Sequence, residues 1–107
     1  MDREIMKGSI DILMLGLLSK REMYGYEMVK RLKSQSNNLY NMSEGTLYPA
    51  LKRLEKKGWL TSYWSESLSG RRKYYQITDA GRGILNEKLK EWKNVNDLIL
   101  RTAEDLS

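Results

Sequence analysis

Residues 43–78 read SEGTLYPALKRLEKKGWLTSYWSESLSGRRKYYQIT, and this stretch decides the fold. The apolar residues of its first third follow the i, i+3, i+4, i+7 spacing of an amphipathic helix: Leu47, Ala50, Leu51 and Leu54. In residues 60–66 and 73–78, aromatic or apolar residues alternate with polar ones, as in a β-hairpin with one buried side. A short helix followed by a two-stranded ribbon is therefore expected.

The face of this helix opposite the apolar stripe suits a close approach to another surface. It presents Gly45, Pro49, Lys52 and Lys56, flanked by Thr46, Tyr48 and Arg53. Small groups come first and long cations later, which is the order needed by a helix whose N-terminus enters the major groove of DNA. The expected N-cap is Ser43, or Asn41 if the preceding loop is shorter, and Lys57-Gly58 is the expected stop. Pro49 removes one backbone hydrogen bond, so we expect the helix to start late or to bend there.

The hairpin is expected to bury one side and to carry a basic tip. Leu60 and Trp64 share a face and should lie on the buried side. Residues 67–72 are too many for a two-residue turn, which predicts a mobile wing. The cations of this wing are Arg71, Arg72 and Lys73. A helix for the groove and a cationic ribbon for the neighbouring backbone together favour double-stranded DNA as the partner.

The positive charge of the chain is concentrated in its middle. Residues 20–73 hold 12 Lys and Arg against 5 Asp and Glu, whereas residues 1–19 hold 2 against 3 and residues 74–107 hold 5 against 6. Such a cationic surface binds anionic polymers through counterion release. The plain alternative is a solvated surface that serves solubility, and charge alone does not choose between the two.

Two helices are expected before residue 40. The apolar segment 5–18 is hydrophobic nearly all round, which indicates a central helix covered by other elements or by another subunit. Residues 24–26 mark a turn, after which a second helix runs to about Leu32 or Ser34. Tyr26 is expected in the core, and Tyr48 at a phosphate.

The last helix should be too long for so small a core. Thr78-Asp79 is its expected cap, and a helix from Ala80 to Ala103 is about 36 Å long. Its apolar residues recur at spacings of three and four, as in a coiled-coil seam: Leu85, Leu89, Trp92, Val95 and Ile99. An exposed seam requires a partner, and a second copy of the chain is the commonest one. We therefore expect a homodimer; the alternative is a helix folded back on its own core.

Several functional classes are disfavoured by composition. The chain has no Cys and no His, which removes thiol chemistry, the commonest general base and the commonest nitrogen ligand of metals. With no glycine-rich phosphate loop or spaced carboxylate pair either, no enzyme, metal site or cofactor is expected. We find no signal peptide or membrane-spanning run, and the mixed charges of the last helix do not suit a membrane surface. A cytoplasmic protein is expected.

Four segments of the chain resemble the PadR family of bacterial transcriptional regulators. They are YGYE at residues 24–27, SEGTLYPAL at residues 43–51 with RLE at residues 53–55, GRRKYY at residues 70–75, and TDAG at residues 78–81. They occur in the family's order and spacing and span nearly the whole chain. The resemblance implies a mainly α fold with a small β-hairpin, namely a winged helix-turn-helix over residues 1–78 and a long C-terminal dimerisation helix over residues 79–107.

The resemblance also implies a function. It predicts a homodimer joined through the first and last helices that represses by occupying a palindromic promoter site. It further implies release by a planar hydrophobic small-molecule effector, as in multidrug-sensing relatives in which a tryptophan of the last helix lines a hydrophobic pore between subunits. Trp92 stands at the corresponding position and would also anchor the dimer.

These expectations name the site residues. DNA contacts are predicted for Tyr24, Ser43, Gly45, Thr46, Tyr48, Lys52, Arg53, Arg71, Arg72 and Lys73. The dimer interface is predicted at Leu85, Leu89, Trp92, Val95 and Ile99, with ligand binding at Trp92. The alternative function is a winged-helix module for protein–protein contact without sequence-specific DNA binding. Such a module would tolerate neutral residues on the third helix and the wing, whereas both are basic here.

Overall fold

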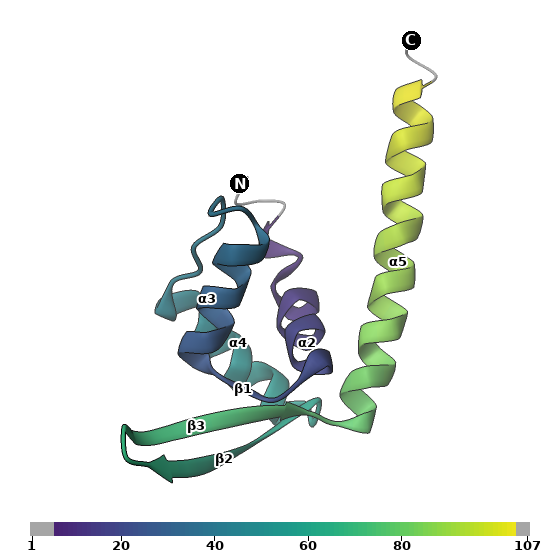
Figure 1. The fold of residues 1–107 in the computed structure, drawn as a ribbon. Coiled ribbons are helices and arrows are strands. Elements are labelled where there is room, and N and C mark those ends of the chain that lie inside the picture. The colour runs from purple at the N-terminus through teal and green to yellow at the C-terminus, as the bar shows by residue number, and fades with distance from the viewer. Residues whose placement is uncertain (1–5, 105–107) are drawn as a thin grey trace.

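The computed structural model describes residues 6–104 of the chain. In chain order the elements are α2 (Ile10–Lys20), β1 (Met23–Tyr24), α3 (Gly25–Gln35), α4 (Glu44–Lys56), β2 (Leu60–Ser67), β3 (Gly70–Ile77) and α5 (Asp79–Glu104) (Figure 1). This is the expected winged helix-turn-helix with a long C-terminal helix. Residues 1–5 and 105–107, at the ends of the two expected units, lie outside the described residues. Among the described helices, none combines the length and the apolarity that crossing a membrane requires.

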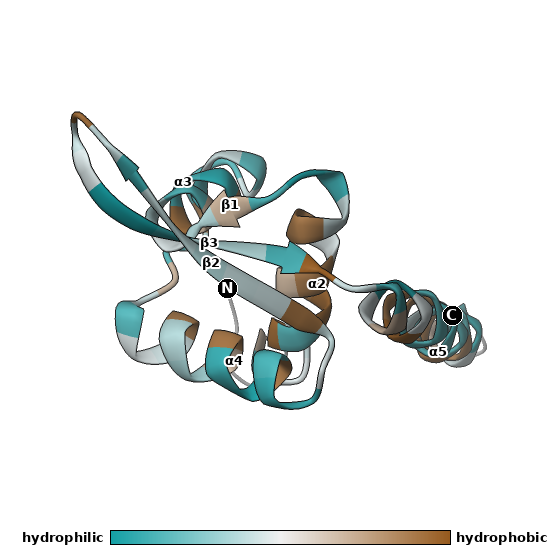
Figure 2. Ribbon diagram, turned by 90° about the horizontal axis from the view of Figure 1, so that it is seen from below, coloured by the Kyte–Doolittle hydropathy of each residue, from teal (hydrophilic) through white to brown (hydrophobic). Residues whose placement is uncertain are grey.

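The body of the molecule is a layer of helices on one face of a small antiparallel sheet. The strand order is β1-β3-β2. The β2–β3 hairpin projects beyond the helices on one side, and α5 rises away from them on the other (Figures 1 and 2). These two projections give the molecule its extents of 59 × 30 × 21 Å.

The centre of the core is α2, as its all-round hydrophobicity predicted. Its buried residues are Ile10, Met14, Leu15, Leu17 and Leu18. The other elements complete the core with Met23, Met28, Leu32, Leu47, Ala50, Leu51, Leu54, Leu60, Tyr75 and Leu85. The expected helix over residues 5–18 is interrupted: residues 6 and 7 are helical, Gly8 and Ser9 form a turn, and α2 begins at Ile10. Residue 5, where the helix was expected to start, lies outside the described residues.

The sheet has a third strand that the sequence pattern did not reveal. A turn was expected at residues 24–26, but Met23 and Tyr24 form β1 and pair with Tyr75 and Tyr74 of β3. Two residues are too few to show an alternating pattern, and their partners are about fifty positions away in the chain. The helix after this strand is close to expectation, since α3 ends at Gln35.

The predicted six-residue wing loop is wrong. The ladder between β2 and β3 continues to the pair Ser67↔Gly70, so only Leu68 and Ser69 form the turn. The Ser67 hydroxyl closes this turn by donating to the carbonyl of Gly70 at 3.2 Å and by accepting from the N–H of Ser69 at 3.3 Å. Gly70 has a φ of +119°, which glycine adopts without steric cost. The cations at 71–73 therefore belong to β3 and not to a loop.

The helix α4 starts at Glu44 with Ser43 as the N-cap, so it does not start late. Pro49 lies inside the helix at an exposed position, where water can take the place of the lost backbone partner. The end is the expected one. Gly58, at φ +80°, donates to Glu55 and Trp59 donates to Leu54, the two hydrogen bonds of a Schellman motif.

The helix α5 begins in the core and then leaves it. The hydroxyl of Thr78 accepts a 3.0 Å hydrogen bond from the N–H of Gly81, which confirms the expected cap. Leu85 is only 7% exposed and packs in the core of its own chain. Beyond it the helix stands free of the other helices (Figure 1).

Candidate nucleic-acid interface

The outer face of α4 is a cationic surface on a well-packed support. Its inner face is buried, with Leu47, Ala50, Leu51 and Leu54 on the stripe that the sequence predicted. Gly45, Tyr48, Pro49, Lys52 and Lys56 are exposed, as the opposite face of such a helix must be. Side chains on this face can approach a ligand without disturbing the core.

The N-terminus of α4 presents two hydroxyl groups. Ser43 is exposed and donates a 3.2 Å hydrogen bond from its hydroxyl to that of Thr46, which is half-buried. The Ser43 side chain makes no hydrogen bond to the backbone at the helix start. The backbone donors of this first turn and the helix dipole both favour an anion here, such as a DNA phosphate.

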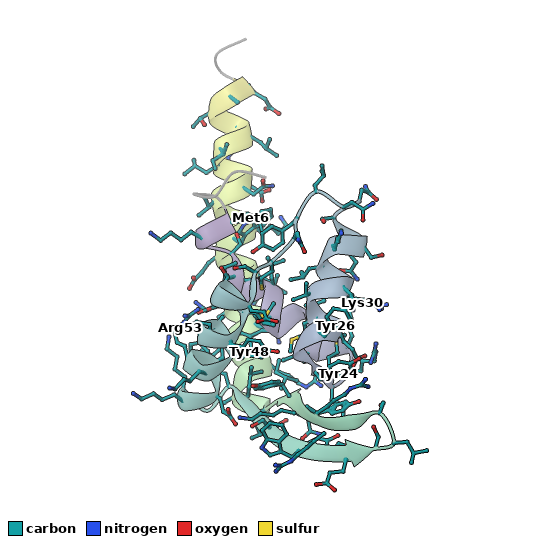
Figure 3. All side chains as sticks on the ribbon, turned by 90° about the vertical axis from the view of Figure 1, so that its left-hand side faces the viewer. Met6, Tyr24, Tyr26, Lys30, Tyr48 and Arg53 are labelled. Carbon is teal, nitrogen blue, oxygen red and sulfur yellow. The ribbon has the colours of Figure 1, made fainter. Side chains whose placement is uncertain are left out.

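Gly25 explains how Tyr48 is placed. A Cβ atom at Gly25 would lie 2.7 Å from the hydroxyl oxygen of Tyr48, so a larger residue there would displace the Tyr48 ring. Figure 3 shows Tyr48 between α4 and α3, with the hairpin below. The tyrosine thus comes from the DNA-reading helix of the expected motif but is positioned by its neighbour.

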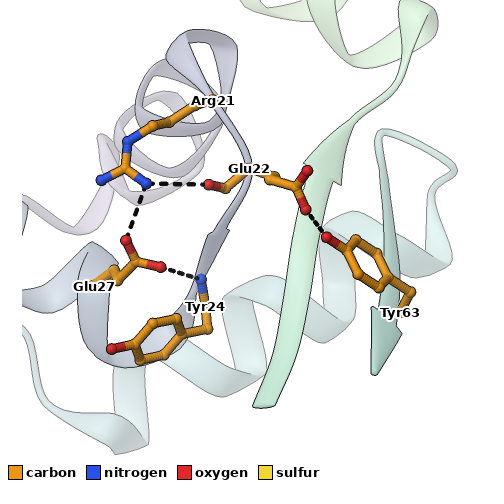
Figure 4. A network of polar contacts seen from close by, with 5 residues as sticks. All are labelled: Arg21, Glu22, Tyr24, Glu27 and Tyr63. Carbon is orange, nitrogen blue, oxygen red and sulfur yellow. Dashed lines mark hydrogen bonds and ion pairs between the residues drawn. The ribbon is translucent and has the colours of Figure 1, made fainter. Parts of the chain in front are cut away.

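A polar network fixes the start of α3 against the sheet (Figure 4). Glu27 accepts a 3.3 Å hydrogen bond from the backbone N–H of Tyr24 and forms a 3.0 Å ion pair with Arg21. The hydroxyl of Tyr63 on β2 donates to the carboxylate of Glu22. These contacts join the loop before β1 to both α3 and the hairpin, so the helix and the wing keep one orientation.

Strand alternation places the three wing cations on two different faces. Arg71 and Lys73 lie on the face that carries Leu60 and Tyr75 toward the helices, whereas Arg72 lies on the opposite face. We call these the inner and the outer face of the hairpin. The predicted set of wing cations is therefore divided, and only Arg71 and Lys73 face the same side as α4.

The outer face carries a row of aromatic rings from all three strands. The ring of Tyr74 stacks on Tyr63 at 5.7 Å and meets Tyr24 edge to face at 5.5 Å. The guanidinium of Arg72 lies 4.5 Å from the centre of the Tyr24 ring. Tyr24 and Arg72, both predicted DNA contacts, thus pack on each other away from α4.

Arg53 has a partner within the chain. Its guanidinium forms an ion pair with Asp11, which ties α4 to α2. The two residues are 42 positions apart, so no local pattern could reveal the pair. Lys52, by contrast, has an exposed side chain on the outer face of α4.

Two aromatic residues that the sequence pattern predicts to be buried are exposed. Tyr26 is 62% exposed, and the Lys30 ammonium lies 5.2 Å from its ring centre, so the expected core position is wrong. Trp64 is 53% exposed, although it shares a face with the buried Leu60. The position of Trp64 along the hairpin could have indicated its exposure. Trp64 comes four residues after the buried Leu60, and four residues of a strand span about 13 Å, which is enough to pass the edge of a small core.

The apolar stripe of α5 is exposed in the single chain. Leu89, Trp92, Val95 and Ile99 are between 47% and 58% exposed. Leu85, the first residue of the expected seam, is buried in its own chain instead. The part of the seam that is free to meet a partner therefore begins at Leu89.

A family model for the transcriptional regulator PadR-like family matches residues 14–87. The chain belongs to this family. The match to the family model confirms the resemblance of the four segments to PadR proteins. Because the family consists of transcriptional regulators, the match also confirms the expectation of a transcriptional regulator and not an enzyme.

Solved structures and curated relatives are similar to this chain in fold and in sequence. A transcriptional regulator from Clostridium thermocellum superposes with a TM-score of 0.88 at 36% identity, over 94% of this chain and 96% of that one. The negative transcriptional regulator PadR of Bacillus subtilis is 29% identical over 94 residues, which are 85% of this chain and 48% of that protein. The crystal structure of Bacillus subtilis PadR in complex with operator DNA matches with a TM-score of 0.67 at 28% identity, over 75% of this chain and 45% of that chain. The chain thus spans about half the length of this PadR relative.

Proposed function

We propose that this PadR-family protein is a repressor that binds a palindromic promoter site as a homodimer. The observation that carries the proposal is the placement of two basic elements on one side of the fold. The outer face of α4 carries Lys52 and Lys56, and the inner face of the hairpin carries Arg71 and Lys73. The Bacillus subtilis relative that is a negative regulator and whose structure contains operator DNA supports both the partner and the sign of regulation.

The homodimer is proposed from the exposed stripe of α5. This helix has 26 residues and is about 39 Å long, of which only the first turns pack on the core of the chain. A stripe of four large apolar side chains on a free helix is unfavourable in water, and pairing with the same stripe of a second chain would bury it. Two-fold symmetry of the protein would then require two-fold symmetry of the DNA site.

The effector is proposed at Trp92. In the single chain its indole is exposed on the stripe, so in a dimer it would lie at the interface beside its symmetry mate. Two facing indoles can hold a planar apolar ring, and a positive charge on that ring gains from the aromatic faces. A compound bound there would alter the angle between the two α5 helices and, through it, the spacing of the two α4 helices on DNA.

Selection of bound duplexes from a random pool, with the mass of the protein measured by light scattering, tests the first two parts. A dimer that selects a palindrome is the expected result. A monomer, or a dimer that selects no consensus, would contradict specific operator binding and favour a winged module for protein contact.

The effector is tested by fluorescence in a chain with Trp59→Phe and Trp64→Phe, which leaves Trp92 as the single tryptophan. Planar cationic dyes should quench Trp92 and lower affinity for the selected operator. If a broad panel of dyes neither quenches Trp92 nor competes with DNA, the effector proposal is contradicted, and the role of Trp92 is packing in the dimer alone.

A further inference from the structure

The distal half of the hairpin holds an exposed tryptophan between two cations. Trp64 on β2 is paired in register with Lys73 on β3, and Arg71 follows on the same inner face. The guanidinium carbon of Arg71 lies 4.4 Å from the centre of the Trp64 ring, and the ammonium nitrogen of Lys73 lies 5.8 Å from it. Both separations are within the range of cation–π attraction.

We propose that Trp64 is a positioning residue of the DNA interface, whose indole holds the Arg71 guanidinium ready for a phosphate contact. The proposal rests on the DNA binding proposed above and adds to it a residue of the wing. It makes the wing a preformed contact in which the arginine has lost most of its rotamer freedom before DNA arrives.

Packing in the core does not account for a tryptophan at this position. Leu60 lies four residues earlier on the same face and is 1% exposed, whereas half of the Trp64 side chain faces water. Between them Ser62 donates a hydrogen bond to the carboxylate of Glu55 on α4, which marks the edge of the body. Trp64 therefore lies beyond Ser62 along the hairpin, and its two cation–π contacts, with Arg71 and Lys73, come from the wing.

Arg71 lies over this indole although a carboxylate stands opposite. Glu66 is its register partner on β2, and opposite charges in such cross-strand pairs attract. The ion pairs of residues 6–104 nevertheless join other groups, and Arg71 is in none of them. A guanidinium that lies flat on a ring would keep the N–H donors in its plane available for a phosphate. An ion pair with Glu66 would have engaged those donors and neutralised the charge.

The direction of the cluster matches the proposed binding surface. The inner face of the hairpin looks toward the side on which α4 lies, and α4 contacts β2, so Arg71 and Lys73 project to the side of the molecule that carries α4. A duplex contacted by the outer face of α4 would have its flanking backbone in this corner. The indole supports the cations there without contributing a charge of its own.

The test compares Arg71→Lys in two backgrounds, wild type and Trp64→Leu, by measuring affinity for duplex DNA over a salt series. Lysine keeps the charge but not the planar group that lies over the indole. We expect Arg71→Lys to weaken binding about two- to fivefold in the wild type and to have almost no effect in Trp64→Leu. Trp64→Phe, which keeps an aromatic face, should restore most of the affinity that Trp64→Leu loses.

The matched control is Arg72→Lys, because Arg72 also lies over an aromatic ring but on the outer face. Its effect on DNA binding should be small and independent of Trp64. As a second readout, Trp64 emission in a chain with Trp59→Phe and Trp92→Phe should change when duplex is added. This readout keeps the proposal testable even where Trp64→Leu fails to fold.

An equal effect of Arg71→Lys in both backgrounds, or Trp64 emission unaltered by DNA, would overturn the proposal. Lys52→Ala with Lys56→Ala separates this failure from that of the proposed function. If these lysines matter for binding while the Trp64 variants do not, only the wing proposal fails. A wild-type protein that binds no duplex at low salt would overturn both.

Discussion

The side-chain hydroxyl of Thr78 donates a 2.7 Å hydrogen bond to the carbonyl oxygen of Gly58. The same hydroxyl caps α5, and the backbone N–H of Thr78 donates a 3.0 Å bond to the carbonyl of Trp59. The first turn of α5 is thus bonded directly to the loop that ends α4. A helix proposed to hold the dimer and a helix proposed to read DNA therefore share one rigid joint.

The joint predicts that Gly81→Ala is strongly destabilising. A Cβ atom at Gly81 would lie 2.2 Å from the carbonyl oxygen of Trp59, a backbone atom that cannot turn away. We expect a loss of about 1–3 kcal/mol in the free energy of unfolding, measured by urea denaturation. Gly83→Ala is the matched control, because its Cβ would meet no atom within 4 Å and should stabilise the helix by about 0.5–1 kcal/mol. Equal effects of the two substitutions would contradict the close approach.

Thr78→Val should weaken the joint without changing the shape of the side chain. It removes the cap of α5 and the bond to Gly58, for which we expect a loss of about 1–2 kcal/mol. Thr78→Ser keeps the hydroxyl and should stay close to the wild type. Denaturation and operator affinity are measured on both variants, and a valine variant as stable as the serine one would rule out this role.

Replacing Trp92 and Ile99 together with Glu should give monomers. Both residues lie on the exposed stripe of α5, and burying two added charges per chain would disfavour the pairing. Loss of the dimer should lower the affinity for the operator. Sedimentation measures the dimer, and DNA titration measures the affinity. Asn94→Glu, an exposed position on the other side of α5, serves as the control. A wild-type protein that is a monomer and still binds a palindrome tightly would contradict the dimer proposal.

The two faces of the hairpin predict unequal roles for its cations. Arg71→Ala and Lys73→Ala should weaken binding to all duplexes, and each should lower the salt slope by about one for a lost phosphate contact. Arg72→Ala should affect DNA less, because Arg72 lies over Tyr24 on the outer face. Equal losses for all three substitutions would show that both faces meet the DNA.

Stability should decline in alkali partly through Tyr75. Burial raises the pKa of its hydroxyl above the usual 10.0, with smaller contributions from the nearby Glu55 and Tyr48. Because the folded-state pKa is the higher one, this contribution is complete below pH 10 and is lost as the pH rises through the folded value. Tyr75→Phe should make the fall in the free energy of unfolding shallower as the pH rises above about 10. If the fall is equally steep in the variant and in the wild type, another group is responsible. Tyr40 is one such group, because burial also raises the pKa of its hydroxyl.

Much of the helical architecture could be predicted because its signals are local. The stripe from Leu47 to Leu54, the stop at Gly58 and the cap at Thr78 each depend on residues within a few turns of one another. The errors arose where a local signal was too short or was outweighed. β1 has only two residues, and the Ser67 hydroxyl with Gly70 made a two-residue turn out of a polar stretch that composition marked as a loop.

By itself, then, the sequence determined the order of helices and hairpin, the basic middle of the chain and its family. Only the tertiary structure decided which side chains share a surface. It placed Arg71 and Arg72 on opposite faces, joined Arg53 to Asp11 and left Trp64 in water. The reason is physical: periodicity follows from backbone geometry over a few residues, whereas a shared surface depends on where strand pairing ends and how far the core extends.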